Sequence, residues 1–204
     1  MKIETLLPLG KLEPGVRASD TPMDIRSVTT GAREVEALGF DGIVVEETKE
    51  DPYVVLALAA EATERVQLAP SVAMAFPRSP TITAMTAWSL QKLSGGRFVL
   101  GLGSQVRGHI RRRFGLEYHP SGPWMREYVE AVRAVWHCWQ QGTSLQHHGD
   151  RYQLSLMVPL FDPGPIEHPV IPIHIAAVNR YMCRVAGEVA AGVRAHPVCT
   201  PRYI

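Results

Sequence analysis

The chain has 204 residues, enough for one domain with a sizeable hydrophobic core. Its hydrophobic content of 46% and charged content of 20% are typical of a soluble globular protein. The formal net charge is +1, with 21 Lys and Arg against 20 Asp and Glu, which argues against nucleic acid or a membrane surface as a partner.

The three cysteines, Cys138, Cys183 and Cys199, lie far apart and form no CxxC pair, so reduced thiols are expected. The N-terminal residues lack the basic segment and apolar run of a signal peptide. No stretch approaches the ~18 consecutive apolar residues of a membrane span. We therefore expect a soluble, cytoplasmic protein.

The first half of the chain alternates short apolar runs with segments of helical spacing, which is typical of α/β folds with parallel strands. Asp51-Pro52 supplies an N-cap and a first helical residue, and Gly39 is a natural helix stop. The predicted strands are 2–7, 42–46, 66–73 and 98–102, and the predicted helices are 24–38, 51–62 and about 82–93.

The second half begins with an amphipathic helix that starts near Pro123 and runs to about Trp139. An inserted hairpin of about 143–158 follows, with the runs 145–148 and 152–156 flanking Gly149-Asp150. We expect this hairpin to lie outside the wall of strands. A strand at Ile173–Ala177, a helix to about residue 189 and a strand at 192–196 complete the pattern.

Six strand–helix units are compatible with two architectures. One is a complete doubly wound sheet, and the other is a (β/α)₈ barrel, which typically takes ~250 residues and would be incomplete here. Length favours the doubly wound sheet, and the periodicity of the sequence does not separate the two.

The glycine-rich loop that starts at Gly101-Leu102-Gly103-Ser104 follows a buried strand. Glycines there let a backbone approach a flat ring or a phosphate closely. Val106 stands where a dinucleotide fingerprint needs a third small residue, which counts against a doubly wound dinucleotide-binding fold. A tight turn without a ligand is the alternative.

Several charged residues are further candidates, each with a plainer explanation. Glu46 and Glu47 end the second strand and point to opposite faces, so at most one faces a pocket, and Glu47 is our choice over a solvated carboxylate. Asn179-Arg180 opens a helix and suits an anion, although an ordinary helix start explains it nearly as well. The arginines at 107, 111, 112 and 113 suit an anion or a solvated helix face, and the histidines form no metal motif.

Taken in order, several short motifs of the sequence are similar to those of the luciferase-like flavin monooxygenase family. Within that family they are most similar to the oxidoreductases that use the deazaflavin coenzyme F420. LSGGRF at 93–98 followed by LGLGSQ at 100–105 is the most specific pair. Supporting words cover nearly all of the chain: GFDG (39–42), DP (51–52), LALAAEATER (56–65), RSP (78–80), REYV (126–129), AAV (176–178) and AGEVAAGV (186–193).

The resemblance implies a (β/α)₈ barrel with the cofactor ring at the carboxyl ends of the strands, and it outweighs the argument from length. It implies a single domain with six of eight units, whose C-terminal part is missing. The implied activity is hydride transfer between a deazaflavin and a small organic substrate. The alternatives are an FMN-dependent monooxygenase on the same barrel, or a non-catalytic remnant that binds a partner through exposed edges, with a homodimer possible.

Carried over by position, the resemblance assigns three groups of cofactor contacts. Ser71-Val72 match a non-prolyl cis peptide that supports the ring, and Gly103, Ser104 and Gln105 match the ring-edge loop. The segment around the cofactor's side chain and phosphate is matched by Ala176, Ala177, Val178 and Asn179, with Arg180 adding a cation.

The chain departs from the family pattern in three places. Many relatives have a catalytic histidine after the second strand, where Glu46-Glu47-Thr48 stands here. Asn179-Arg180 replaces a common Gly-Pro, and Ala191 replaces an acidic residue before the last glycine. Glu47 is therefore our candidate for proton transfer, with His109 in reserve.

An arc of six strands also has two unpaired edges. The inner layers of side chains are also left open where two strands are missing. We therefore expect apolar positions such as Ile3, Leu6, Ile173 and Ile175 to be more exposed than their hydrophobicity warrants.

Overall fold

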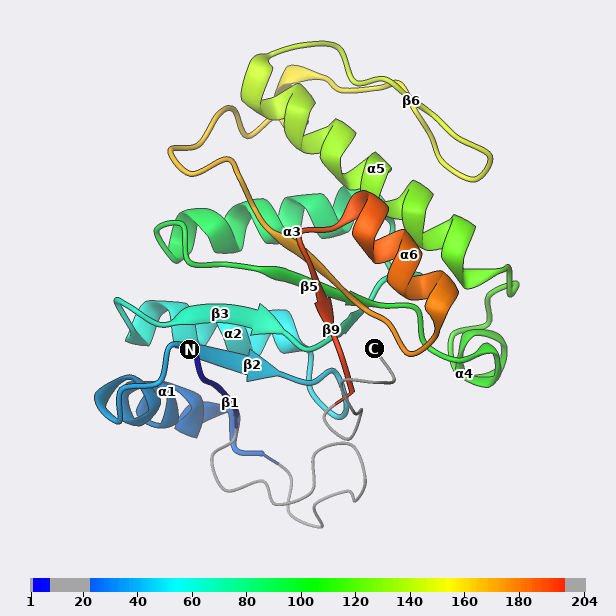
Figure 1. The fold of residues 1–204 in the computed structure, drawn as a ribbon. Helices are drawn as coiled ribbons and strands as arrows, with labels where there is room; N and C mark the ends of the chain where they lie inside the picture. The colour runs from blue at the N-terminus through cyan, green and yellow to red at the C-terminus, as the bar shows by residue number, and fades with distance from the viewer. Residues whose placement is uncertain (1, 8–22, 197–204) are drawn as a thin grey trace.

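The computed structural model describes residues 2–7 and 23–196, so Cys199 lies outside the described residues. In chain order the elements are β1 (Glu4–Leu6), η1 (Ile25–Ser27), α1 (Val28–Ala37), β2 (Gly42–Val45), α2 (Pro52–Ala62), β3 (Gln67–Pro70), β4 (Ala73–Met74), α3 (Pro80–Leu93), β5 (Leu100–Gly103), α4 (Arg107–Arg112), α5 (Ser121–Gln141), β6 (His147–His148), β7 (Gln153–Leu154), η2 (Pro159–Phe161), β8 (Ile173–Ala176), α6 (Arg180–Val189) and β9 (Gly192–Arg194) (Figure 1).

The long strands are all parallel and follow one another in chain order. One ladder runs β1-β2-β3 and a second runs β4-β5-β8-β9. β3 and β4 are two halves of one predicted strand, interrupted at Ser71-Val72. A parallel bridge between Leu68 and Phe98 joins the two ladders, so the strands form one continuous wall.

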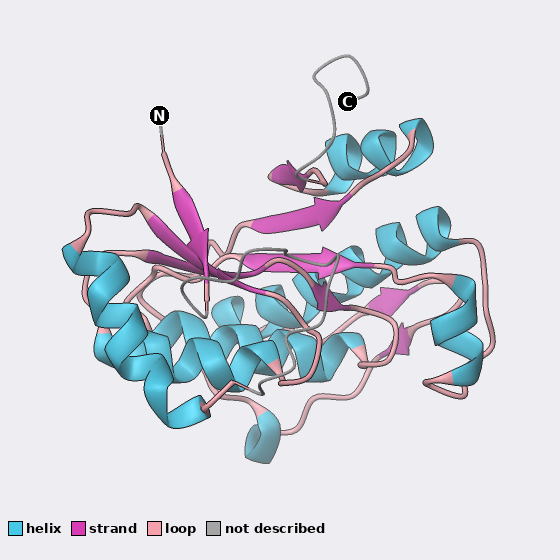
Figure 2. Cartoon of the chain, turned by 90° about the horizontal axis from the view of Figure 1, so that it is seen from below, coloured by secondary structure: helices cyan, strands magenta, loops and turns pink. Residues whose placement is uncertain are grey.

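Chain order distinguishes the two predicted architectures. A doubly wound sheet reverses its strand order at a switch point, which places the first strand in the interior of the sheet. Here β1 and β9 are the two ends of the series, and the helices lie on the outer side of a curved wall (Figure 2). The predicted barrel-type fold is therefore confirmed.

The two ends of the arc are linked by side chains. Among the described residues no ladder pairs β1 with β9. The Arg194 guanidinium of β9 instead contacts the Glu4 carboxylate of β1, with Nη1 and Oε2 2.6 Å apart. This ion pair lies on the inner face of the arc, where Gly42 packs against the Glu4 side chain and Gly101 against Arg194.

The hairpin β6–β7 lies outside the wall, as the sequence predicts. β6 pairs antiparallel with β7, while β5 pairs directly with β8. Figure 1 shows the hairpin beyond α5, away from the parallel strands. The Glu127 side chain of α5 anchors its turn, because Oε1 accepts hydrogen bonds from the main-chain N–H groups of Arg151 and Tyr152, both at 2.7 Å.

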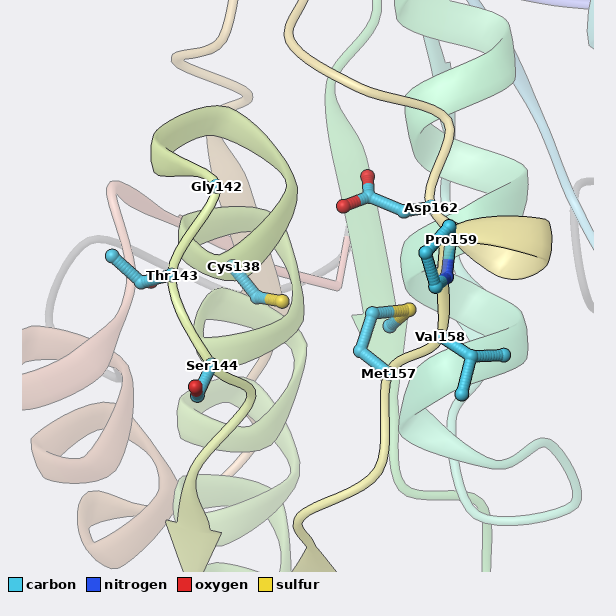
Figure 3. A pocket seen from close by; sticks show the side chains of 8 residues that line it. All are labelled: Cys138, Gly142, Thr143, Ser144, Met157, Val158, Pro159 and Asp162. Atoms are coloured by element: carbon cyan, nitrogen blue, oxygen red, sulfur yellow. The ribbon is translucent and has the colours of Figure 1, made fainter.

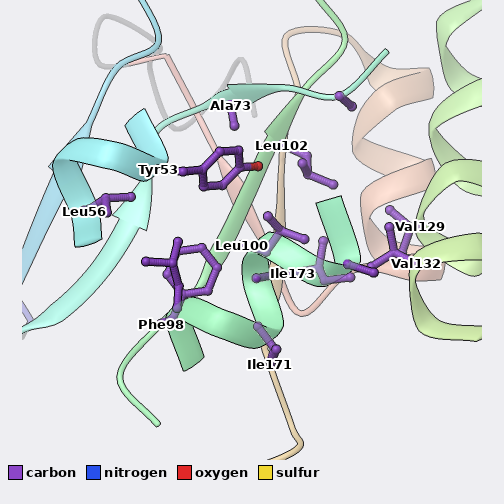
Figure 4. Close-up of a cluster of buried hydrophobic side chains, with 14 of the residues drawn as sticks. Tyr53, Leu56, Ala73, Phe98, Leu100, Leu102, Val129, Val132, Ile171 and Ile173 are labelled. Carbon is purple, nitrogen blue, oxygen red and sulfur yellow. The ribbon is translucent and has the colours of Figure 1, made fainter. Parts of the chain in front are cut away.

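The main core lies between the outer face of the strands and the helices. Leu100, Leu102 and Ile173 gather there with Val129 and Val132 of α5 (Figure 4). The prediction that Ile173 and Ile175 are exposed is wrong, since they are 1% and 0% exposed. Both belong to β8, which is paired with β5 and β9, and both lie in the core. Ile3 is 49% exposed, as predicted, and Leu6 is half-buried.

Arg97, the next-to-last residue of the LSGGRF motif, connects α2, the start of β3 and the turn between α3 and β5 through hydrogen bonds. Its guanidinium donates to the carbonyl oxygens of Ala60, Thr63 and Val66 at 2.7–3.0 Å, and Nε donates to the carbonyl oxygen of Ser94 at 2.7 Å. The carbonyl groups of Ala60 and Thr63 belong to the C-terminal end of α2, where a helix leaves carbonyl groups without intrahelical partners. Arginine at this position thus stabilises the fold by satisfying carbonyl groups.

None of the helices in the described part of the chain combines the length and the hydropathy needed to cross a bilayer.

Candidate cofactor site at the carboxyl ends of the strands

Three segments predicted to bind the cofactor meet at the carboxyl ends of β3, β5 and β8. A Cβ atom on Gly103 would lie 2.4 Å from Val72 Cγ2 and 3.9 Å from Ala176 Cβ. Val72 therefore occupies the space that a side chain at position 103 would need. Val72 and Ala176 are half-buried and Gly103 is buried beneath Val72, and we call these three residues the Val72–Gly103–Ala176 cradle.

The peptide bond between Ser71 and Val72 is cis, as the resemblance predicts. The Ser71 N–H donates to the Val45 carbonyl oxygen at 2.8 Å, which fixes the end of β3 against β2. The Ala75 N–H donates to the Gly103 carbonyl oxygen at 2.9 Å, which fixes the chain beyond β4 against β5. Both sides of the cradle are thus attached to neighbouring strands.

Ser104 and Gln105 follow directly and turn the chain toward α4. Gln105 has a positive φ of 57°, and its side-chain Oε1 accepts a hydrogen bond from the Val106 N–H at 2.8 Å. Because the amide oxygen closes its own turn, the side chain of Gln105 stabilises the shape of this loop.

The start of α6 follows directly from β8, the strand that carries Ala176. Asn179 is the N-cap, and its Oδ1 accepts from the Met182 N–H at 2.9 Å. Other N–H groups of the first helical turn have no intrahelical partner and favour negative charge. Ala177 is buried, whereas Val178 and Arg180 are exposed. The predicted phosphate segment therefore follows directly from the strand that carries Ala176.

Glu47 is held in an ion pair that the sequence analysis did not anticipate. Its carboxylate accepts from the Met74 N–H at 2.7 Å and from Arg78 Nη1 at 2.8 and 3.0 Å. Arg78 Nη2 also contacts Asp51 Oδ2 at 2.9 Å. The side chains of Glu47 and Arg78 are only 12% and 19% exposed, so this is a largely buried pair. Glu47 connects β2 to the end of β4.

The environment of Arg78 keeps this pair charged. Burial lowers the pKa of the guanidinium, but its hydrogen bonds and charge attraction to Glu47 and Asp51 outweigh burial and raise the pKa above its ordinary value. Arg78 also lies 5.2 Å from the centre of the Tyr53 ring. The word RSP at 78–80 contained the only sequence signal for Arg78, because its acidic partners are 27 and 31 residues away.

His109 lies on α4, the short helix after the glycine-rich loop, and is exposed. Among the described residues no side-chain hydrogen bond brings it together with Glu47. The arginine cluster on and after α4 is exposed, with Arg107 near the Tyr118 ring and Arg113 near the Phe114 ring.

His174 of β8 lies on the inner face of the arc and packs against Gly192. Burial lowers the pKa of its imidazole, and the positive charge of Arg194 lowers it further, against a weaker opposite effect of Glu4. Both of the larger effects favour the neutral imidazole.

Comparison with known proteins assigns the chain to a family. Residues 2–204 match the luciferase-like monooxygenase family. The chain belongs to that family. The uncharacterized protein Rv1360 of Mycobacterium tuberculosis is 42% identical over 183 residues, which is 90% of this chain and 54% of that protein. Rv3520c of the same organism, provisionally named a coenzyme F420-dependent oxidoreductase, is 32% identical over 203 residues, 93% of this chain and 55% of that protein.

Among solved structures, monooxygenase RslO1 from Streptomyces bottropensis has a TM-score of 0.74 at 23% identity, covering 87% of this chain and 55% of its own. This likeness supports the barrel-type fold. The luciferase-like chain spans about half the length of the relatives it matches.

Two cavities lie outside the cradle of this luciferase-like chain. One, of about 440 Å³, lies between the C-terminal end of α5 and the segment 157–162, and Cys138 and Met157 face each other across it (Figure 3). In a βα barrel the C-terminal ends of the helices lie at the amino ends of the strands, so this cavity is remote from the cradle. The other, of about 410 Å³, lies beside the turn that follows β4.

Proposed function

We propose that the protein is an oxidoreductase that transfers a hydride between a deazaflavin coenzyme and a small organic substrate. The family of the chain and the name of Rv3520c support this assignment. A luciferase-like barrel is compatible with both deazaflavin- and flavin-dependent reactions. The position of the site, at the carboxyl ends of parallel strands, is where barrel enzymes carry their chemistry.

The Val72–Gly103–Ala176 cradle is the observation that carries the proposal. A flat ring needs a wall of small groups that it can approach closely, and a Cβ atom on Gly103 would collide with Val72. Nearby, Arg180 and the first turn of α6 offer a cation and N–H donors for a phosphate. The residues present therefore fit both the ring and the charged tail of such a coenzyme.

Each predicted residue then has a task. Val72 and Ala176 support one face of the ring, and Gly103 leaves the space that the Val72 side chain occupies. Ser104 and Gln105 shape the loop at the ring edge, and the segment 177–180 holds the anionic tail. When bound, the coenzyme supplies a two-electron hydride carrier that reacts poorly with oxygen, while the protein orients the ring and excludes water.

Proton transfer is the least defined step. The ion pair with Arg78 and the hydrogen bond from the Met74 N–H hold the Glu47 carboxylate in place, which suits a residue that positions the end of β4. His109 is then the better of the two predicted proton donors, since its ring is not held in an ion pair among the described residues. Both roles are proposals.

An activity assay tests the proposal. The chain is mixed with oxidised deazaflavin coenzyme and a panel of small alcohols, and loss of the ring absorbance is followed without oxygen. We expect substrate-dependent reduction of the coenzyme. Reduction that is the same with and without protein would contradict the proposal for this chain.

An FMN-dependent monooxygenase is the second candidate, favoured by the likeness to RslO1 and by the description of the family. Oxygen uptake separates the two, because reduced FMN reacts readily with oxygen and the deazaflavin does not. Substrate-dependent oxygen uptake with FMN would select this alternative. A folded chain that binds neither cofactor would select the non-catalytic scaffold.

A further inference from the structure

The cavity beside the turn that follows β4 is built from three segments that are distant in sequence. It has a volume of about 410 Å³, within the usual range for a small-molecule site. Phe76 and Arg78 come from the turn after β4, His119 and Trp124 from the start of α5 and the loop before it, and Arg151 and Tyr152 from the hairpin turn.

One wall of the cavity is aromatic and rigid. The Phe76 and Trp124 rings are stacked with centroids 3.7 Å apart and planes 1° apart, and both residues are buried. The His119 ring meets Trp124 edge-on at 5.3 Å. Such a wall contacts a flat or branched apolar group at little entropic cost, because the side chains are already fixed.

Two hydrogen-bond donors face this wall. The Tyr152 hydroxyl accepts a hydrogen bond from Trp124 Nε1 at 2.7 Å, which leaves its own proton to donate. Burial raises the pKa of this hydroxyl, which keeps the proton in place at neutral pH. The Arg151 guanidinium lies 5.4 Å from the centre of the Trp124 ring. A guanidinium stacked on a ring keeps its N–H edge for a carboxylate.

The charges around the cavity select the kind of anion. Arg78 is already paired with Glu47 and Asp51. Arg151 is paired with no carboxylate among the described residues, and the carboxylates of Glu117 and Asp150 also line the cavity. The two carboxylates repel any anion, but a dianion more strongly than a monoanion, so an anion bound by Arg151 should carry a single charge.

From this arrangement we infer that the cavity binds a small monocarboxylate with an apolar, ring-sized body. The apolar part lies against Phe76 and Trp124, and the carboxylate accepts from Arg151 and the Tyr152 hydroxyl. The site needs no coenzyme, so its test is independent of the proposed function.

The test uses isothermal titration calorimetry of the chain with benzoate, with benzyl alcohol as the neutral analogue and phenyl phosphate as the dianion. We expect saturable benzoate binding, with both analogues at least about tenfold weaker because they lack the matching charge. Arg151→Gln should weaken benzoate binding by about tenfold or more. Arg133→Gln, at an exposed position of α5, is the matched control and should leave binding unchanged.

Several outcomes would overturn the inference: no benzoate binding by a folded chain, equal binding by Arg151→Gln, or phenyl phosphate binding more tightly than benzoate. Circular dichroism establishes that each variant is folded. Arg151→Lys serves if Arg151→Gln does not fold. It keeps the charge without the forked N–H edge and should bind several-fold more weakly than the original chain, so equal binding by Arg151→Lys would also count against the site.

Discussion

Val72 and Gly103 illustrate how single residues define the candidate site. We predict that Gly103→Val weakens deazaflavin binding by at least about tenfold, because the new side chain must displace Val72 from the cradle. Overpacking of this kind also costs about 1–3 kcal/mol of unfolding free energy.

The measurement for this variant is a fluorescence titration with the coenzyme. Gly187→Ala is the control, because a Cβ atom there meets nothing within 4 Å, and its binding should be unchanged. Undiminished binding by Gly103→Val would show that the ring lies elsewhere.

Glu47 distinguishes a positioning role from a catalytic one. We predict that Glu47→Gln lowers the free energy of unfolding by about 1–3 kcal/mol, because Arg78 loses its largely buried partner. If Glu47 acts only by position, turnover falls without a change in the shape of its pH profile. Loss of one limb of the profile in Glu47→Gln, with His109→Asn unchanged, would instead identify Glu47 as the proton donor.

The residues of the site could be predicted from family resemblance more than from spacing. The spacing of glycines pointed to the loop at Gly103, but nothing in the local sequence indicates that Val72 fills the space beside it. Arg78 was missed as a site residue because its partners follow a different strand, and periodicity carries no information about contacts between strands.

At the scale of elements, Arg97 shows how one side chain joins a helix end to two loops. We predict that Arg97→Ala lowers the unfolding free energy by about 2–4 kcal/mol, because several carbonyl groups lose their donor. Arg97→Lys should recover less than half of this loss, since an ammonium group cannot reach all these acceptors. Urea unfolding measures both, and equal stability of Arg97→Ala and the original chain would contradict the account.

The order of strands and helices was predictable because the N-cap residues and the apolar runs are local signals. Asp51 and Asn179 cap α2 and α6 as expected. The bounds were less predictable: the hairpin strands expected at 145–148 and 152–156 are only His147–His148 and Gln153–Leu154. Ladder pairing ends where cross-strand partners end, and a single sequence does not contain that information.

At the scale of the whole molecule, strand order decided what length could not. Each strand–helix unit has the same local pattern in a doubly wound sheet and in a barrel, so the periodicity of the sequence does not indicate how the units are arranged. The error at Ile173 and Ile175 has the same origin. Their exposure depends on the pairing of β8 with its neighbours and on the packing of the helices against it, which a single sequence does not contain.

The inner face of the arc gives a prediction about pH. His174 has a pKa below its ordinary value when the chain is folded, so the unfolded chain binds the proton first as pH falls through about 6.5. The stability contributed by neutral His174 is therefore complete above that pH and declines below it, until the folded pKa is passed. Urea unfolding at pH 7.5 and 5.5 should show a smaller loss in His174→Asn than in the original chain. Equal losses of unfolding free energy would show that the pKa of His174 is the same in the folded and the unfolded chain.

The central claim is that the carboxyl ends of these strands hold a deazaflavin ring, and a binding titration tests it most directly. The purified chain is titrated with the deazaflavin coenzyme and, separately, with FMN, and the change in ring fluorescence is recorded. The account predicts saturable binding of the deazaflavin that is at least about tenfold tighter than that of FMN and is lost in Gly103→Val. Tighter binding of FMN, or no binding of either by a folded chain, would contradict it.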